Sequence, residues 1–185
     1  MFKKFTILVI SILFCTSLNA SDIARNGGPY IGMGYGISNY NDDGYYTRVK
    51  DWNIASYNLY AGAYINPNLS VELGYLKTGK FHTEENSVQT TFDYSSITVN
   101  VLAHYPVLDD SFDFYAKFGA GQSYVSLSSN DGAALVYGAG ISYRYNKSFA
   151  LRIAYDMYTF DYQSDTKGNY SMDIQYAYAA LEVQF

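Results

Sequence analysis

The chain has 185 residues, of which one is cysteine, one is tryptophan and three are proline. Cys15 lies in the first twenty residues, so a chain that has lost them holds neither a disulfide nor a thiolate site. A lipoprotein signal is the alternative for Cys15, but Phe14 stands where such a signal has a small side chain. After that segment, no run approaches the roughly 18 apolar residues of a transmembrane helix. A disulfide-stabilised fold and a helical membrane protein are therefore both excluded.

The first twenty residues have the pattern of an export signal. Lys3 and Lys4 make the start positive, residues 5–15 are apolar, and Ala20 supplies a small residue at a plausible cleavage point. The apolar run is too short for a membrane anchor, which needs roughly 20 residues. We therefore expect a signal peptide over residues 1–20 and one domain over residues 21–185.

Positive charge is scarce. The chain has 12 Lys and Arg against 17 Asp and Glu, a formal net charge of −5. Loss of Lys3 and Lys4 with the signal leaves ten basic against 17 acidic side chains, a charge of −7. Nucleic-acid-binding proteins carry clustered Lys and Arg. Nucleic acid is therefore not an expected partner.

Tyrosine and glycine are plentiful, with 22 and 15 residues respectively. Tyrosine concentrates where one end of a side chain is apolar and the other is wet, as at a membrane–water interface. Beginning at Pro29, the sequence YIGMGYGIS places large apolar residues on one face and Gly or Ser on the other. Glycine at every second position is unfavourable in a helix. It suits a narrow barrel whose interior takes small side chains.

This alternation recurs along the chain and predicts eight strands. They lie near residues 29–38, 55–65, 71–75, 97–105, 112–121, 135–144, 149–158 and 176–185. Short links near 66–69, 106–110 and 146–148 alternate with mostly longer ones near 39–53, 78–91, 126–132 and 160–171. Short turns on one rim and long outward loops on the other are typical of a membrane barrel. We therefore predict an all-β fold, a closed eight-stranded antiparallel up-and-down transmembrane β-barrel.

The position of the charges distinguishes a membrane barrel from a soluble one of the lipocalin type, which has an apolar cavity and a wet, charged outer face. The apolar face of the predicted strands is almost free of charge, whereas the opposite face holds seven charged residues. Facing lipid, each would cost several kcal/mol near the midplane. We expect them to form a lumen charge network: Glu72, Asp113, Lys117, Arg144, Arg152, Asp156 and Glu182.

Two roles are open for this network. Its four carboxylates and three basic groups nearly balance, and buried ions are expected to pair because an isolated one is costly. The pairs then fill and rigidify a closed barrel. Alternatively they exchange partners and open a path for small solutes.

The chain resembles the small outer-membrane β-barrel proteins of the OmpA/OmpX type, also described as a porin family, over roughly residues 28–185. The resemblance rests on the segments GPYIGMGYGIS, NPNLSVELGY, FYAKFGAG and YGAGISYRY and on an aromatic terminal residue. Leu181, Val183 and Phe185 look like the C-terminal signal read by the barrel-assembly machinery. No peptidoglycan-binding domain follows Phe185, so a cell-wall tether of the OmpA kind is not expected. The resemblance implies fold and location, not an activity.

Candidate chemistry is sparse. His82 lies in a predicted loop with Glu84, Glu85 and Ser87 nearby, which is weak evidence for a nucleophilic site because the fold must place such groups. His104 is expected to be a hydrogen-bonded residue inside the barrel. Residues 41–44 and 130–132 contain Asn, Asp and Gly, but neither has the full ligand spacing of a calcium loop, and turn chemistry explains both. We expect no catalytic, cofactor or metal site and no enzyme.

Aromatic residues also occur in or beside the predicted outer loops, where they either anchor the rim at the lipid interface or bind a partner such as host matrix. They are Tyr40, Tyr45, Tyr46, Trp52, Tyr162 and Tyr170.

Together these features predict an integral outer-membrane protein of a Gram-negative bacterium, exposed at the cell surface. Its expected role is structural or surface-interacting, in membrane integrity or in loop-mediated adhesion to an extracellular ligand. Outer-membrane lipid with lipopolysaccharide and the barrel-assembly machinery are its other expected partners. A narrow porin-like channel for ions or small solutes is the alternative, and a lipid-modifying outer-membrane enzyme is the second.

Overall fold

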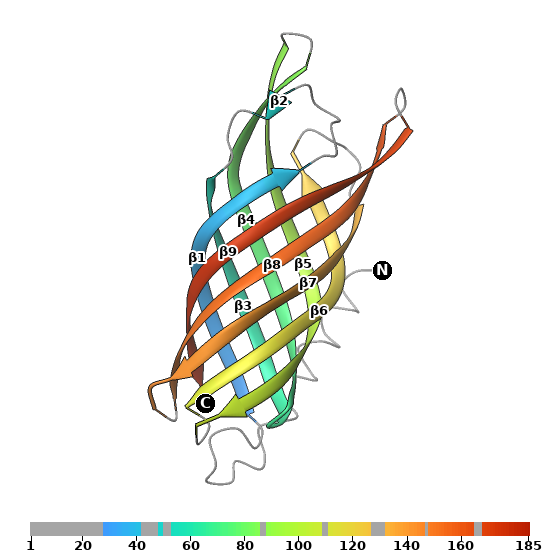
Figure 1. Cartoon of the computed structure of the whole chain (residues 1–185). Coiled ribbons are helices and arrows are strands. Elements are labelled where there is room, and N and C mark those ends of the chain that lie inside the picture. The colour runs from blue at the N-terminus through green and yellow to red at the C-terminus, as the bar shows by residue number, and fades with distance from the viewer. Residues whose placement is uncertain are drawn as a thin grey trace.

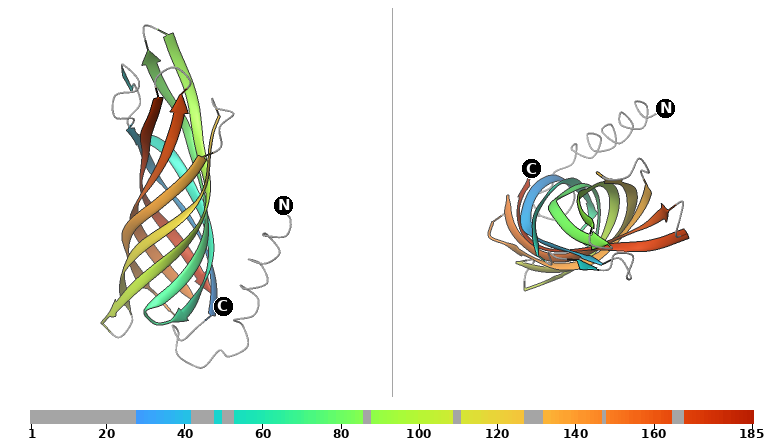
Figure 2. Two further views of the ribbon diagram at one scale, coloured as in Figure 1. Left: turned by 90° about the vertical axis from the view of Figure 1, so that its right-hand side faces the viewer. Right: turned by 90° about the horizontal axis from the view of Figure 1, so that it is seen from above.

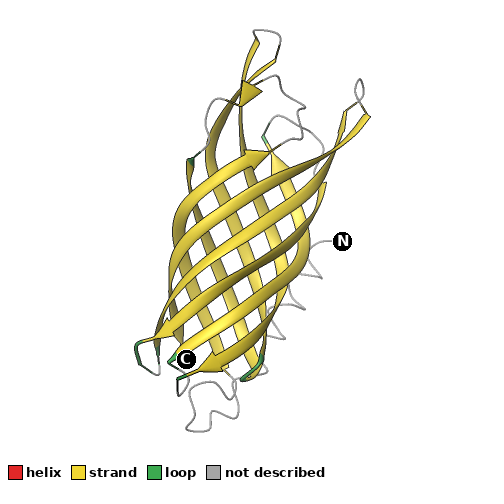
Figure 3. Ribbon diagram, viewed as in Figure 1, coloured by secondary structure: helices red, strands yellow, loops and turns green. Residues whose placement is uncertain are grey.

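The computed structural model describes residues 28–41, 48–49, 53–85, 88–108, 111–126, 132–146, 148–164 and 168–185. The signal segment lies outside them. The described residues form β-strands joined by turns, with no helix among them (Figure 3). None of this part of the chain therefore forms a helix long and apolar enough to cross a membrane. The strands are β1 (Gly28–Asn41), β2 (Arg48–Val49), β3 (Ile54–Asn66), β4 (Leu69–Glu85), β5 (Val88–Val107), β6 (Phe112–Val125), β7 (Gly132–Arg144), β8 (Phe149–Ser164) and β9 (Gly168–Gln184).

Eight of these strands close into a barrel (Figure 1). Neighbours in the chain pair in antiparallel fashion from β3 to β9, β1 pairs with β3, and pairing of β1 with β9 closes the ring. The view from above in Figure 2 shows the strands arranged in a ring. The two-residue β2 lies outside the ring against β4. The predicted closed, eight-stranded antiparallel barrel is confirmed.

The period-two pattern sets the two faces of the wall. In β1, Ile31, Met33 and Tyr35 are exposed on the outside, and inward glycines alternate with them. Gly32 pairs with Tyr60 of β3, whose ring lies where a Cβ atom at position 32 would be. The absence of a side chain thus lets a large tyrosine occupy the lumen. Glycine in these strands is a packing requirement of a narrow barrel.

The short connections form one rim, at the lower end in Figure 1. The Asn66 side chain accepts a hydrogen bond from the Asn68 backbone N–H (2.9 Å), which closes the β3–β4 turn. The Asn146 side chain accepts from the backbone of Ser148 and Phe149 and closes the β7–β8 turn. Asparagine is favoured in turns because its side chain bonds backbone groups two residues on.

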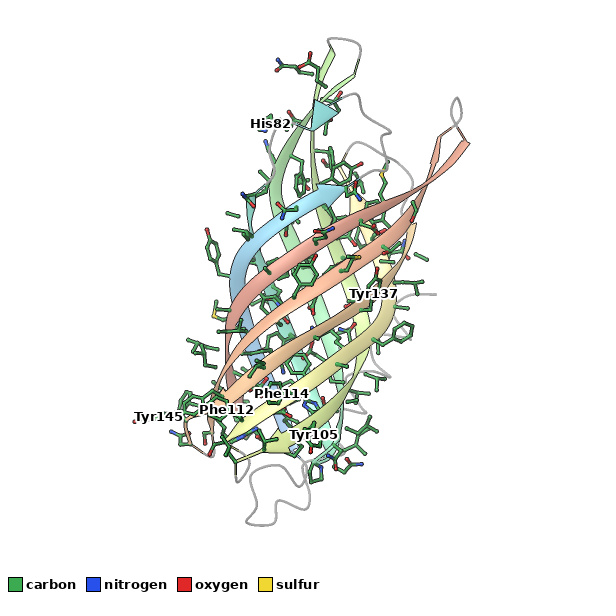
Figure 4. All side chains as sticks on the ribbon, in the orientation of Figure 1. His82, Tyr105, Phe112, Phe114, Tyr137 and Tyr145 are labelled. Atoms are coloured by element: carbon green, nitrogen blue, oxygen red, sulfur yellow. The ribbon has the colours of Figure 1, made fainter. Side chains whose placement is uncertain are left out.

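Exposed aromatic side chains surround the wall above this rim. Figure 4 shows Tyr105, Phe112, Phe114 and Tyr145 near the lower end. The Phe112 ring contacts that of Tyr143 on the neighbouring strand, with ring centres 4.9 Å apart. Such girdles sit at the headgroup level of a membrane.

At the opposite rim, two pairs of strands continue beyond the ends that the sequence predicted. Residues 78–91 and 160–171 were expected to be long loops, but β4–β5 pairing runs to Glu85 and Val88, and β8–β9 pairing runs to Ser164 and Gly168. The β4–β5 pair rises well above the rest of the wall, and the β8–β9 pair extends outward to one side (Figure 2). The apolar alternation continues there through Phe81, Phe92 and Phe160, so pairing buries those side chains.

A β-bulge marks where the β4–β5 extension leaves the barrel. The register shifts between Lys77 and Lys80. At the bulge, Thr78 Oγ1 accepts a hydrogen bond from the Tyr94 backbone N–H (3.0 Å) and lies 3.2 Å from the Tyr94 carbonyl oxygen. A side chain thus replaces the missing backbone partner. Bulges increase local twist, which redirects the extension.

Candidate functional site

The centre of the lumen holds five ion-paired side chains from four strands. Arg152 of β8 lies 2.8 Å from Glu72 of β4 and 2.6 Å from Glu182 of β9. Lys117 of β6 lies 3.2 Å from Glu72 and 2.8 Å from Asp156 of β8. All five are buried. Shared partners make them a single cluster, the central network.

Tyrosine rings enclose the arginine of the central network. The Arg152 guanidinium carbon lies 4.3 Å from the ring centre of Tyr60 and 4.9 Å from that of Tyr115. Tyr30 contributes a third ring at 5.8 Å. Cation–π attraction is stronger when water is excluded. The rings and the two carboxylates together hold this arginine in one position across the lumen.

A second polar group lies nearer the short-turn rim. His104 Nδ1 is 2.7 Å from Asp113 Oδ2, and His104 Nε2 is 2.8 Å from Ser70 Oγ. These contacts have the arrangement of a Ser–His–Asp nucleophilic triad. Ser70 is fully buried, however, so a substrate has no space at its oxygen. Tyr30, whose hydroxyl lies 3.2 Å from Ser70 Oγ and 3.3 Å from Glu72, joins this group to the central network. The geometry describes a hydrogen-bond relay.

All seven charged residues expected in the lumen are buried, and five of them form the central network. The structure brings Glu72, Lys117, Arg152, Asp156 and Glu182 together. Asp113 instead binds His104, and Arg144 donates a hydrogen bond to Gln184 at the lower end of the barrel. Strand register explains the division, because Asp113 and Arg144 lie at strand ends, near the turns.

An apolar layer that was not predicted from the sequence covers the polar groups toward the long-strand rim. The Tyr94 ring stacks on Phe160, with ring centres 5.0 Å apart. Tyr40 contacts both Phe81 and Phe92, at 5.7 and 4.9 Å. All five rings are buried. The spacing of Phe81 and Thr83, and of Phe92 and Tyr94, two residues apart on one face of their strands, was the available signal.

The remaining candidates lie apart from the lumen or outside the described residues. Tyr40, expected in or beside an outer loop, is a buried residue of β1, because its side chain falls on the inward face. His82 is exposed on the β4–β5 extension, where Figure 4 labels it, and Glu84 is half-buried there.

Several residues that the sequence singled out lie outside the described part. The segments Asp42–Gly44 and Asn130–Asp131, together with Ser87, lie outside it, as do the side chains of Tyr45, Tyr46, Trp52, Glu85, Tyr162 and Tyr170. Asn41 ends β1 and Gly132 begins β7. Within the described ranges, no group of three or more His, Cys, Asp or Glu side chains forms a metal site.

The geometry defines a class of protein. The barrel wall exposes an apolar outer face, its charges are buried in the lumen, and aromatic rings surround the short-turn rim. Water on such an outer face would favour aggregation, whereas lipid matches it. The protein is an integral β-barrel protein of the bacterial outer membrane. A family model described as the outer membrane protein beta-barrel domain matches residues 6–185, and the chain belongs to this family.

Two curated relatives show the range of the family. The attachment invasion locus protein of Yersinia pseudotuberculosis serotype I (strain IP32953) is 25% identical over 166 residues, which cover 84% of this chain and 88% of that protein. Outer membrane protein A of Klebsiella aerogenes is 26% identical over 167 residues, which cover 83% of this chain and 47% of that protein. The chain thus spans about half the length of the second relative.

Solved structures share the fold. The crystal structure of Ail, the attachment invasion locus protein of Yersinia pestis, matches with a TM-score of 0.57 and 21% identity. Neisserial surface protein A matches with a TM-score of 0.63 and 16% identity. Each match covers 86% of this chain and 99% of the other.

Proposed function

We propose that the protein is a surface-interaction protein whose two strand extensions above the barrel bind an extracellular ligand. The observation that carries this proposal is the continuation of β4–β5 and β8–β9 past their neighbours, around buried aromatic rings. A pre-ordered surface loses less conformational entropy on binding than a mobile loop does. The extensions thus present a binding surface at a fixed height above the membrane.

The names of the relatives support this role. One is an attachment invasion locus protein, and its Yersinia pestis counterpart has a crystal structure in complex with the heparin analogue sucrose octasulfate. We carry over attachment to an extracellular molecule. We do not carry over the sulfated ligand, since residues 21–185 have ten basic against 17 acidic side chains, a formal net charge of −7, and like charge opposes the binding of a polyanion.

The interior supports a closed barrel in this proposal. Lys117 and Arg152 each bridge two carboxylates, and the stacked Tyr94 and Phe160 belong to the apolar layer above them. The central network therefore serves as a plug that rigidifies the barrel beneath the two strand extensions. This arrangement does not favour the channel alternative. Unchanged lipid A mass spectra on overexpression are expected, since we propose no enzymatic role.

The proposal includes a route to the membrane and surroundings there. Residues 1–20 direct export, and Leu181, Val183 and Phe185 are the signal for the barrel-assembly machinery. All three side chains of that signal lie on the outer face of β9 or directly after it. Outer-membrane lipid and lipopolysaccharide surround the apolar wall.

Adhesion of cells tests the role of the extensions. Residues 80–92 are replaced by Asn-Gly, and cells of a non-adherent Gram-negative host displaying either chain are applied to immobilised extracellular matrix. We expect adhesion to fall to the level of cells without the protein. Heat-dependent gel mobility shows that the shortened barrel is folded. A folded, shortened barrel that adheres like the intact one would refute the proposed function.

A further inference from the structure

We propose that a trough on the lipid-facing side of the wall, running across β5 to β9, holds one acyl chain of a phospholipid from the periplasmic leaflet. The site goes beyond the proposed function, because it lies on the lower part of the wall and not on the strand extensions. It makes one part of the wall a place where a single lipid chain is held, whereas the rest of the wall meets lipid without preference.

A row of mostly small side chains forms the floor of the trough. Ala103 of β5 pairs with Ala116 of β6, and Ala116 pairs with Ala139 of β7. Ala139 pairs with Tyr155 of β8, which pairs with Ala177 of β9. All five side chains are exposed on the outer face. Because paired residues lie side by side across a sheet, the row crosses five neighbouring strands.

Large side chains stand on both sides of this floor. Two residues nearer the short-turn rim on each strand, and on the same face, is a row of exposed large residues: Tyr105, Phe114, Ile141 and Ile153. Figure 4 labels the first two at the lower end of the barrel. On the other side of the floor, Phe118 pairs with Tyr137, and both are exposed. The hollow over the alanines has a volume of about 730 Å³, and every residue that lines it is uncharged. Ligand pockets have volumes of roughly 300–1,000 Å³.

Lipid is what meets this hollow. The outer wall is the lipid interface of the barrel, and the trough is continuous with it. Lipid chains are as apolar as the wall, so removal of apolar surface from water does not hold a chain there. Dispersion contacts do, because a gap left over the alanines would have no partner atoms on one side. A chain on the floor contacts the wall on three sides, whereas a chain on a flat part contacts it on one.

The position and length of the trough select the leaflet. Its lower end is at Tyr105, near the short turns, which face the periplasm in such barrels. From Ala103 to Ala177 the floor crosses four strand spacings, about 19 Å in all. With strands tilted by roughly 35–45°, this row rises only about 12 Å along the membrane normal. Half of the hydrocarbon core is about 15 Å deep, so one chain of the periplasmic leaflet can follow the whole floor.

A second copy of the chain does not fit the trough. Two barrels in one membrane pack about a two-fold axis along the membrane normal, and each presents the same surface to the other. Each trough lies roughly 45–55° from that axis, so two facing troughs lean to opposite sides and cross at about 70–90°. A row of large side chains on one barrel therefore cannot lie along the floor of the other. A flexible acyl chain has no such restriction.

Native mass spectrometry tests the site on the full barrel. The protein is released from nanodiscs of palmitoyl-oleoyl-phosphatidylethanolamine and lipopolysaccharide, and the bulk lipid is stripped from it by collisional activation. We expect monomers that retain one phospholipid. Monomers that retain no lipid, or lipopolysaccharide alone, would overturn the proposal, and so would dimers free of phospholipid.

Two variants locate the retained lipid. Ala139→Leu fills the middle of the floor, and we expect the phospholipid-bound fraction to fall by about fivefold or more. The matched control is Ala120→Leu, which is also exposed on the outer face of β6 but does not line the hollow, and it should retain the lipid as the parent does. Both substitutions face lipid, so heat-dependent gel mobility should be unchanged. If Ala139→Leu alters that mobility, Ala116→Leu replaces it. Equal retention by the floor variant and the control would show that the trough is not the site.

The same variants keep this site distinct from the proposed function. Because the trough is remote from the strand extensions, Ala139→Leu should adhere as the parent does. Loss of the lipid from this variant with unchanged adhesion is therefore the expected pair of results.

Discussion

At the scale of single residues, Arg152 shows how a charge is accommodated inside a membrane barrel. Its guanidinium is fully buried, donates to Glu72 and Glu182, and lies against the rings of Tyr60 and Tyr115. Removing one member of a buried ion pair strands the other, whereas replacing all members by neutral groups removes the desolvation cost as well. The arginine is therefore costly to remove alone.

We expect Arg152→Ala to lower the free energy of unfolding by about 3–5 kcal/mol, because Glu72 and Glu182 lose their shared partner. The measurement is urea unfolding in detergent micelles, followed by circular dichroism. The matched control combines Arg152→Met with Glu72→Gln and Glu182→Gln, and should recover much of the loss. A single variant no less stable than the triple one would contradict this account of the network.

At the scale of secondary-structure elements, the β4–β5 hairpin joins two environments. Its lower part belongs to the wall and its upper part is the free-standing extension, with the bulge at Thr78 between them. The threonine hydroxyl supplies the hydrogen-bond partner that the shifted register withdraws from Tyr94. One side chain thus lets the strand continue past the irregularity.

Thr78→Val keeps the shape of the side chain and removes the hydroxyl. We expect the buried Tyr94 N–H to lose its partner, at a local cost of about 1–3 kcal/mol, and the amides above the bulge to exchange faster with solvent. Hydrogen exchange followed by NMR measures this, with Thr78→Ser as the control that retains the hydroxyl. Equal exchange in the valine and serine variants would show that the hydroxyl is dispensable.

At the scale of the whole molecule, closure and filling act together. Pairing of β1 with β9 removes the last edges of the wall, and the polar and apolar layers occupy the lumen in succession. A barrel filled in this way differs from a porin, whose lumen contains water. Closure and filling each predict the result of one measurement on the whole molecule.

Closure predicts resistance to detergent. Because every strand of the wall has two neighbours, the unboiled protein should stay folded in dodecyl sulfate and migrate faster on a gel than the boiled protein. Arg152→Ala should lose the fast-migrating form at a lower temperature. Identical migration of boiled and unboiled samples would refute the closed barrel in solution.

Filling predicts an electrically silent barrel. In planar bilayers we expect no steady conductance from the parent chain, and none from Lys117→Ala, because the layer containing Tyr94 and Phe160 still covers the lumen. Conductance is expected only when Tyr94→Ala and Phe160→Ala are combined with Lys117→Ala. Steady conductance of the parent that changes with Lys117→Ala would instead support the channel alternative.

The sequence by itself determined the alternation of faces, the number of strands and the side of the wall that meets lipid. These are local properties, since a period of two assigns each side chain to a face, as for Ile31 against Gly32. It also indicated which residues carry the interior charge. Strand ends were less well predicted, because polar residues such as Thr83 and Thr90 near the long-strand rim occur equally in loops and in paired strands.

Only the tertiary structure decided which side chains meet. Glu72 and Arg152 lie 80 positions apart in the chain, and their contact across the lumen depends on the register accumulated around a closed ring. The same register places Asp113 beside His104 and Arg144 beside Gln184, and it directs Tyr40 into the apolar layer. Local pattern assigns a residue to the inside, but closure sets the partners, because each strand's position depends on all the others.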